Sequence, residues 1–305
     1  MNLKGVGILA TAGVLALLPA GLAHAGACNK SAALNRSICQ KQVLTDFQVA
    51  MGKCANVTAG DQKACRDEAR TERNDSMGDC ADIGSAYHDA CGLLGDVAYD
   101  PAIDPNDFST TIDNPYYPLV PGTTFVYEAQ TADGLEHNEV AVTGDTETLM
   151  GVPCVVVHDT VALDGVLTED TYDYYAQDSA GNVWYFGEYS YTLENGRIVD
   201  IAGSWRAGVD GAKPGIIMEA NPMVGDVYRQ EFFFSEAEDM AQVLDLAGSE
   251  TVPYQPFSGA LVTRAFTPLE PDGDEHKFYL PGTGLMLEVD QQTGDRNELI
   301  DIKHN

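Results

Sequence analysis

Residues 28–91 read CNKSAALNRSICQKQVLTDFQVAMGKCANVTAGDQKACRDEARTERNDSMGDCADIGSAYHDAC. This stretch holds six of the seven cysteines of the chain, at positions 28, 39, 54, 65, 80 and 91, with gaps of ten and fourteen residues in alternation. Cysteines and apolar residues recur at the three- and four-residue spacing of a helix face from Ser31 to Ala55 and from Gln62 to Ala90. The residues 58–61 between them contain a glycine. The pattern predicts two helices joined by a tight turn.

The cysteine spacing also predicts how the cysteines pair. Facing residues of an antiparallel hairpin have a constant sum of residue numbers, and that sum is 119 for Cys28–Cys91, Cys39–Cys80 and Cys54–Cys65. Six cysteines allow 15 pairings. Neighbours eleven residues apart on one helix lie about 16 Å apart, whereas a disulfide needs Cα atoms within about 7 Å. We therefore predict these three nested disulfides. A 26-residue repeat is the competing interpretation, and a zinc site fits less well because the short spacing of zinc cysteines is missing.

Residues 1–25 are typical of a secretory signal peptide. Lys4 precedes an apolar run from Val6 to Leu18, and Ala23-His24-Ala25 forms a small-residue cleavage site. Lipoprotein processing at Cys28 is the less favoured alternative, because no large apolar residue lies three positions before it. Both routes predict export, to the periplasm or the exterior, where disulfides persist. No segment has the roughly 20 apolar residues that a transmembrane helix requires.

The charge of the chain limits its partners. It has 47 Asp and Glu against 17 Lys and Arg, a formal net charge of -30. Nucleic acid and anionic membrane surfaces would repel such a chain, so we expect neither as a partner. Cation binding is compatible with this charge, and so is a simple solvated surface. A small molecule or an envelope protein remains the expected partner.

Beyond the hairpin, which we place at residues 26–94, the pattern changes twice. Residues 95–121 contain five prolines interleaved with aspartates and predict an extended connector. Residues 122–305 alternate short apolar runs with turn dipeptides such as Asp133-Gly134 and Asn195-Gly196, the strongest short hairpin signal. We predict an antiparallel meander that forms a barrel or a strongly curved sheet. One segment, Ser235–Ala241, is expected to be helical, with Ser235 and Glu238 as a capping box.

Several segments of this β region resemble a widespread family of exported bacterial domains. The residues that carry the resemblance are NPYYPLVPGTTF at 114–125, DTYDYYAQD at 170–178 and EHKFYLPGTGL at 275–285. The last segment is also similar to a turn in half-barrel lipoprotein domains. The resemblance covers about residues 100–302 and implies a β-rich exported domain preceded by a cysteine-bearing helical segment. It implies no activity.

Two acidic turns lead into similar Glu-His pairs and are candidates for a metal site. The pairs are Glu136-His137 and Glu275-His276, and together they offer two imidazoles and two carboxylates to a divalent ion. Adjacent strand residues point to opposite faces, so at most one of each pair can point inward. A second candidate is Glu236 with Asp239 in the expected helix, where calcium would find oxygen ligands. Solvated turns explain the Glu-His pairs, and a helix dipole explains the second cluster; we favour these simpler interpretations, and no cofactor is certain.

The stretch from Tyr172 to Tyr191 is rich in aromatic residues. One strand face carries Tyr172, Tyr174, Trp184 and Phe186, which we take as candidates for lining a pocket for an apolar or sugar ligand. Tyr175 and Tyr185 lie on the other face. Ordinary barrel core is the simpler interpretation. Cys154, the seventh cysteine, is expected to be a buried free thiol.

These features favour an exported binding or scaffold protein of the envelope, without catalytic activity, in which the hairpin serves as a spacer or docking arm. A divalent-cation-binding protein that uses acidic loops is the first alternative. A hydrolase with a site assembled from distant loops is the second, although neither a nucleophile elbow nor a phosphate loop is present.

Overall fold

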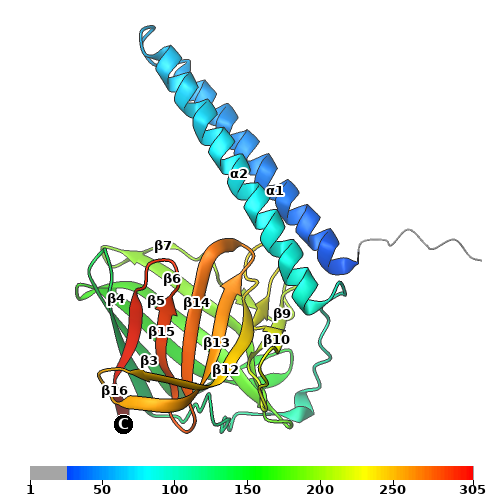
Figure 1. Cartoon of the computed structure of the whole chain (residues 1–305), viewed down its shortest axis with the longest axis vertical. Helices are drawn as coiled ribbons and strands as arrows, with labels where there is room; N and C mark the ends of the chain where they lie inside the picture. The colour runs from blue at the N-terminus through cyan, green and yellow to red at the C-terminus, as the bar shows by residue number, and fades with distance from the viewer. Residues whose placement is uncertain (1–25, 305) are drawn as a thin grey trace, which may run out of the picture.

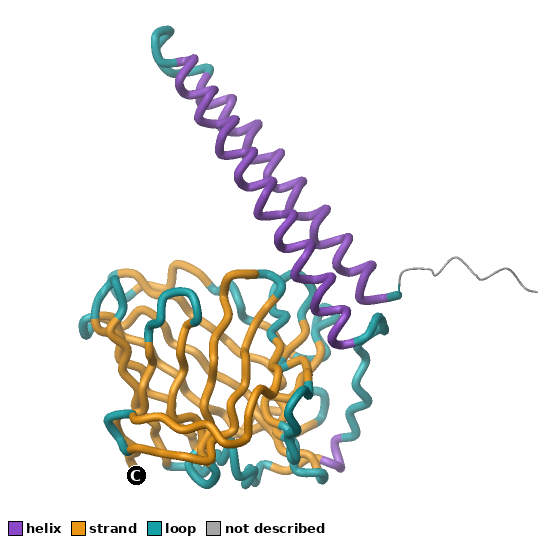
Figure 2. Tube along the Cα trace, viewed as in Figure 1, coloured by secondary structure: helices purple, strands orange, loops and turns teal. Residues whose placement is uncertain are grey.

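The protein combines a long helical hairpin with a β domain that curls into a nearly closed barrel (Figures 1 and 2). The computed structural model describes residues 26–304. The predicted signal peptide, residues 1–25, lies outside the described residues. None of the described helices is long and apolar enough to cross a membrane.

The hairpin consists of α1 (Ala27–Cys54) and α2 (Gln62–Leu94). Disulfides join Cys28 to Cys91, Cys39 to Cys80 and Cys54 to Cys65, with Cα atoms 5.6–5.7 Å apart. This is the pairing that the constant sum predicts. Apart from the cysteines, the buried residues of the two helices are small or polar except for Tyr87. Covalent links therefore replace most of the hydrophobic seam that a two-helix arm would otherwise need, since a disulfide restricts the unfolded chain.

The remaining chain forms one antiparallel sheet of 16 strands. The first eight are β1 (Phe108–Ser109), β2 (Thr123–Gln130), β3 (Leu135–Leu149), β4 (Val152–Leu163), β5 (Val166–Asp178), β6 (Val183–Glu194), β7 (Arg197–Asp200) and β8 (Trp205–Arg206). The last eight are β9 (Lys213–Met218), β10 (Val227–Arg229), β11 (Glu231–Phe232), β12 (Met240–Thr251), β13 (Pro256–Thr267), β14 (Glu270–Leu280), β15 (Gly284–Asp290) and β16 (Arg296–His304).

The strand order closes the sheet on itself. It runs β10-β12-β13-β14-β15-β16-β2-β3-β4-β5-β6-β9-β11, so the first and last parts of the β domain meet where β16 pairs with β2. At the opposite side, β9 packs against β10, which brings the two ends of the order together. Alternate side chains therefore point into a common interior, as in a small barrel. The prediction of a mainly β fold with a barrel-like sheet and a disulfide-linked hairpin is confirmed.

The connector follows the outside of the barrel. Residues 95–121 include a short 3-10 helix, η1 (Pro105–Asp107), and β1, which pairs with β5. Ile112 and Leu119 are buried and bridge to each other. Phe108 packs edge-on against Trp184 and Phe186 of β6. The proline-rich stretch thus covers an aromatic outer face of the sheet.

The expected helix at Ser235–Ala241 is absent, which corrects the sequence prediction. Residues 234–236 form a turn, Phe233 bridges to Ala237, and Met240 already begins β12. Half of the expected capping box does form, because Glu238 accepts the N–H of Ser235 at 3.0 Å. Ser235, however, has φ of 66°, a left-handed conformation that starts no helix.

Candidate functional site

The interior of the barrel contains a cavity of about 290 Å³, which we call the barrel cavity. Strands from both halves of the β domain line it, and the connector covers it with Tyr117, Pro118 and Leu119. Its aromatic lining consists of Phe125 and the tyrosines Tyr117, Tyr127, Tyr175, Tyr185 and Tyr279. Its charged lining consists of Asp159, Asp173, Glu188, Glu231, Asp239, Glu288 and one lysine, Lys277. A cavity with this many carboxyl groups is unlike an ordinary barrel core, because charged groups are rarely buried without partners.

A β-bulge brings two of these carboxyl groups together. Asp173 pairs with Glu188 and Tyr175 with Tyr185, so β6 has one residue more than β5 in this interval. The extra residue shifts the alternation, and Tyr185 and Glu188 both reach the cavity although they are three positions apart. Gly187, inside the bulge, has φ of 137°, and a Cβ there would lie 2.4 Å from the carbonyl oxygen of Trp205. Glycine is therefore required at this position.

The tyrosines form a connected aromatic wall. Tyr175 and Tyr185 stack with ring centroids 4.8 Å apart, and Tyr117 meets Tyr175 edge-on at 5.6 Å. Tyr117 also lies 6.3 Å from Tyr279 on the far wall. The Tyr127 hydroxyl donates to the carbonyl oxygen of Leu285 at 3.1 Å. Offset and edge-on rings of this kind hold one another in place, so the wall is rigid before any ligand enters.

Burial keeps several of the carboxyl groups protonated near neutral pH. Desolvation and then the neighbouring Asp173 raise the pKa of Asp159 to about 8. Desolvation likewise raises the pKa of Asp173 to about 7, and that of Glu188 to about 9 with a further contribution from Asp173. The pKa of Glu231 is raised by desolvation and by Asp239. The common cause is the loss of water around groups of like charge.

The hydrogen bonds leave part of this carboxyl lining unsatisfied. The Tyr185 hydroxyl donates to Asp173 Oδ1 at 2.6 Å, and Trp205 Nε1 donates to Glu231 Oε2 at 2.7 Å. Asn138 donates to Asp159 Oδ1. Among the described residues no donor reaches Asp173 Oδ2 or the Glu188 carboxyl group, although Asp173 is only 8% exposed. These oxygens lie at the wall of the cavity, where a ligand can supply the missing donors.

One wall of the cavity carries the ion pairs of Lys277. Lys277 Nζ lies 2.7 Å from Glu288 Oε1 and 3.2 Å from Glu275 Oε2. Desolvation acts to lower the pKa of Lys277, but Glu288 and Glu275 together raise it well above its usual value. Asn297 Nδ2 donates to Glu288 Oε2 at 2.9 Å. The lysine is thus paired on this wall, and beyond it its charge acts on Asp239 but not on Asp173 or Glu188.

The four aromatic residues expected to line a pocket lie outside the barrel cavity. Trp184 and Phe186 face outward under Phe108 of the connector. Tyr172 stacks on His158 at 4.5 Å, and Tyr174 lies beneath Arg206. The cavity uses the opposite face of the same strands, with Tyr175 and Tyr185. Phe108 of the connector packs on Trp184 and Phe186, so this part of the outer face is also apolar and covered.

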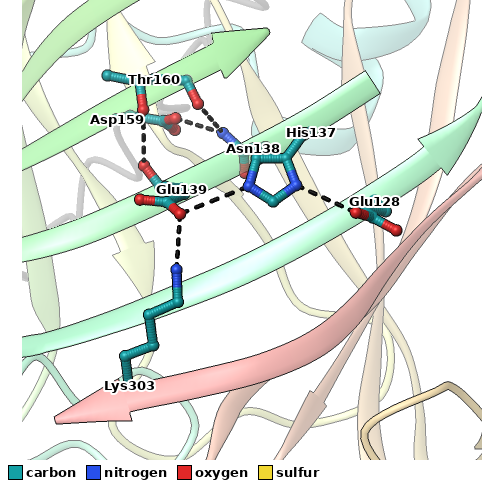
Figure 3. Close-up of polar contacts among 7 residues, drawn as sticks. All are labelled: Glu128, His137, Asn138, Glu139, Asp159, Thr160 and Lys303. Atoms are coloured by element: carbon teal, nitrogen blue, oxygen red, sulfur yellow. Dashed lines mark hydrogen bonds and ion pairs between the residues drawn. The ribbon is translucent and has the colours of Figure 1, made fainter. Parts of the chain in front are cut away.

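The two Glu-His pairs do not come together. β3 and β14 are separated by β15, β16 and β2, so His137 and His276 lie at distant places on the sheet. His137 lies on the outer face, between Glu128 at 3.2 Å and Glu139 at 3.5 Å, and Glu139 also binds Lys303 (Figure 3). Asn138, between them in sequence, points the other way toward Asp159 (Figure 3). Glu136 shares the inner face with Asn138, and Glu275 shares the inner face with Lys277.

The acidic residues of the turn before β12 have three different environments. Glu236 is exposed, Glu238 is fully buried against the helical hairpin, and Asp239 lines the barrel cavity. They therefore form no common calcium site. Within residues 26–304, no three His, Cys, Asp or Glu side chains gather as a metal site would require. Cys154 is a buried free thiol, and burial raises its pKa to about 12.

Of the cavity carboxyl groups, the sequence pointed only to Asp239, and as a calcium ligand; the others lie on five different strands. One signal was available. Asp173 lies two residues before Tyr175, and Asp159 two residues after Val157, so each acid shares a strand face with an apolar or aromatic residue. An acidic residue on the apolar face of a strand is unusual. The bulge that redirects Glu188 has no comparable signature beyond Gly187.

Comparisons with known proteins add little to this geometry. No family model matches the chain, and no curated protein is similar to it. A solved structure described as a "putative lipoprotein" from Parabacteroides distasonis matches with 14% identity and a TM-score of 0.33, over 62% of this chain and 98% of that one. The resemblance to a family of exported domains therefore stays a prediction.

Proposed function

We propose that this protein is an exported binding protein that holds a small polar molecule in the barrel cavity. The observation that carries the proposal is the cavity itself, which is lined by five tyrosines and by carboxyl groups, among them Glu188, to which no described residue donates. Its volume of about 290 Å³ is about twice that of a cavity of about 150 Å³ that accepts benzene. A pocket of this size, with a rigid aromatic wall and a few convergent polar groups, is what small-molecule sites have in common.

The helical hairpin supports a role in presenting this site. It projects from the barrel as a straight arm (Figure 1), and a buried contact fixes its base: Tyr87 Oη donates to Glu238 Oε1 at 2.7 Å. Asn35 Nδ2 reaches the same oxygen at 3.3 Å, and Arg229 lies 3.6 Å from Oε2. A stapled arm with a fixed base can hold the binding domain at a set distance from a surface or a partner.

Export of the chain is part of the proposal. Three disulfides are typical of proteins from oxidising compartments. Cys28 is bonded to Cys91, and a sulfur in a disulfide cannot also carry a lipid thioether. We therefore expect the exported form to carry no lipid on Cys28. Intact mass of protein from the exported fraction should equal that of residues 26–305 less six hydrogens; an added diacylglyceryl mass would contradict this.

Native mass spectrometry of the exported protein tests the binding function. We expect a retained small molecule, or one taken up from an envelope extract, at one per chain. Val140→Phe places a ring in the cavity that Val140 lines and should abolish this uptake. Ala141→Phe, its neighbour on the outer face of β3, is the matched control and should bind as the parent does. Equal uptake by all three proteins would contradict a site in the barrel cavity.

A further inference from the structure

We propose that the ligand of the barrel cavity is a small organic cation, an amine whose ammonium group lies between Asp173 and Glu188 against the stacked rings of Tyr175 and Tyr185. This inference rests on the proposed function and names the class of ligand that the site takes. Three features of the cavity support it: its charge balance, its open hydrogen-bonding positions and its aromatic wall.

The charge balance calls for a cation. Lys277 is paired with Glu288 and Glu275 on its own wall. Lys277 also acts on Asp239. No lysine or arginine of the cavity acts on the other four carboxyl groups of the lining, which are Asp159, Asp173, Glu188 and Glu231. An anionic ligand would find no positive charge on that side and would oppose the ionisation of these carboxyl groups. A neutral ligand would leave the carboxyl groups crowded as they are.

The hydrogen-bonding positions match an ammonium group. Asp173 Oδ2 and both Glu188 oxygens lack donors among the described residues, and the two side chains extend from directly paired positions on β5 and β6. An ammonium group has three donors and no acceptor. Bonds from a charged donor to carboxylates are about twice as strong as neutral ones. One such group can therefore satisfy both side chains.

The aromatic wall distinguishes an organic amine from a metal ion. Tyr185 belongs both to the stacked pair with Tyr175 and, through its hydroxyl, to Asp173. A cation over a tyrosine face is attracted by the ring quadrupole, and more strongly in a site that excludes water. A metal ion instead needs several oxygen or nitrogen ligands at short range, and residues 26–304 offer no such group of three.

Binding of an amine is coupled to release of protons. The apo carboxyl groups hold protons because burial and like charge raise their pKa values, and a bound ammonium group favours the ionised forms. The affinity for the amine should therefore fall about tenfold for each unit by which the pH is lowered, wherever binding releases one proton. The charged groups that act on Asp173 and Glu188 from the inner face are Asp159 on β4, Glu169 on β5, Glu231 on β11 and Asp239 before β12. His158 acts on Asp173 from the outer face of β4, where it contacts Asp170.

Isothermal titration calorimetry of the full exported chain tests the inference with 1,4-diaminobutane as the probe. Neutral 1,4-butanediol and glucose and the anion succinate are the comparison ligands. We expect the amine to bind, the anion and the diol not to bind, and the amine affinity to rise at least tenfold from pH 6 to pH 8. The heat should vary with the ionisation enthalpy of the buffer, because protons leave the protein.

Single carboxyl-to-amide variants test whether the amine binds between Asp173 and Glu188. Asp173→Asn and Glu188→Gln keep the shape of each side chain and should each weaken amine binding at least tenfold. Glu128→Gln and Glu139→Gln alter outer-face carboxylates (Figure 3) and should leave it unchanged. Binding of glucose without the amine would overturn the inference and leave the proposed function standing. The inference would also be overturned if the outer-face variants weakened amine binding as much as Asp173→Asn and Glu188→Gln do. No binding of any probe, with no effect of Val140→Phe on native mass spectra, would overturn both.

Discussion

Gly187 is the residue on which the geometry of the cavity depends most. Its φ of 137° and the 2.4 Å approach of its would-be Cβ to the Trp205 carbonyl leave no room for a side chain. Gly187→Ala should therefore destabilise the fold by about 2 kcal/mol or more and move Glu188 out of register with Asp173. Gly144→Ala, where a Cβ meets open space, should change stability by about 0.5 kcal/mol at most. Urea unfolding measures both, and equal costs would show that the bulge is not constrained.

Stability of the empty protein should fall as the pH rises. Asp159, Asp173 and Glu188 have pKa values raised to about 8, 7 and 9 in the folded state. The folded chain then holds protons that the unfolded chain has released above about pH 4, so stability declines through pH 5 to 9. Thermal unfolding should show a midpoint about 5 °C or more lower at pH 8 than at pH 5.

Single variants show whether the cavity carboxyl groups cause this decline of stability with pH. Asp173→Asn removes one of the groups with a raised pKa and should flatten the decline with pH. Asp272→Asn, on the exposed start of β14, removes a carboxylate without this environment and should leave the slope as it is. A decline that neither variant changes would come from the overall negative charge of the chain.

At the level of elements, the docking of the hairpin depends on one buried acid. Glu238 is 1% exposed and meets Tyr87, Asn35 and Arg229. The guanidinium of Arg229 lies over the adjoining rings of Tyr99 and Phe232. Glu238→Ala leaves this guanidinium buried without an anion and should cost about 3–5 kcal/mol in unfolding free energy. Glu236→Ala, exposed in the same turn, should cost about 0.5 kcal/mol at most.

The disulfides should hold the arm together independently of the barrel. Few large side chains are buried between α1 and α2, so reduction should melt the hairpin while the sheet persists. Circular dichroism should lose most helical signal on reduction, with the strand signal retained. Peptide mapping of the unreduced chain should recover only the three nested pairs. Retention of full helicity after reduction would mean that packing alone holds the arm.

For the molecule as a whole, the sequence predicts the architecture better than the site. The hairpin follows from the cysteine numbers, and the meander from turn dipeptides such as Asn195-Gly196, because both signals are local. The closure of the sheet through β9 and β10 is not local, and neither is the cover that the connector lays on Trp184 and Phe186. Because the connector packs on Trp184 and Phe186, aromatic residues occur on the outer face of β6 as well as on the inner one. Alternation alone therefore could not show which face lines the cavity.

The helix expected at Ser235–Ala241 failed for a related reason. Its capping residues are present, but Glu238 is drawn into the contact with Tyr87 and Arg229, which a local pattern cannot reveal. Similarly, Glu136 and Glu275 do point inward while their histidines point outward, as alternation requires, yet three intervening strands keep the two pairs apart. Long-range pairing decided each of these outcomes.

The proposed cation site requires that the carboxyl groups inside the barrel cavity be protonated when it is empty and ionised when it is filled. Carbon-13 NMR titration of the side-chain carboxyls, without and with 1,4-diaminobutane, measures this protonation directly. We expect Asp173 and Glu188 of the empty protein to titrate with pKa values of about 7 and about 9, because burial opposes their charge. Both values should move down when the amine is present. Ordinary pKa values near 4, unchanged by the amine, would contradict the cavity as a site for a cationic ligand.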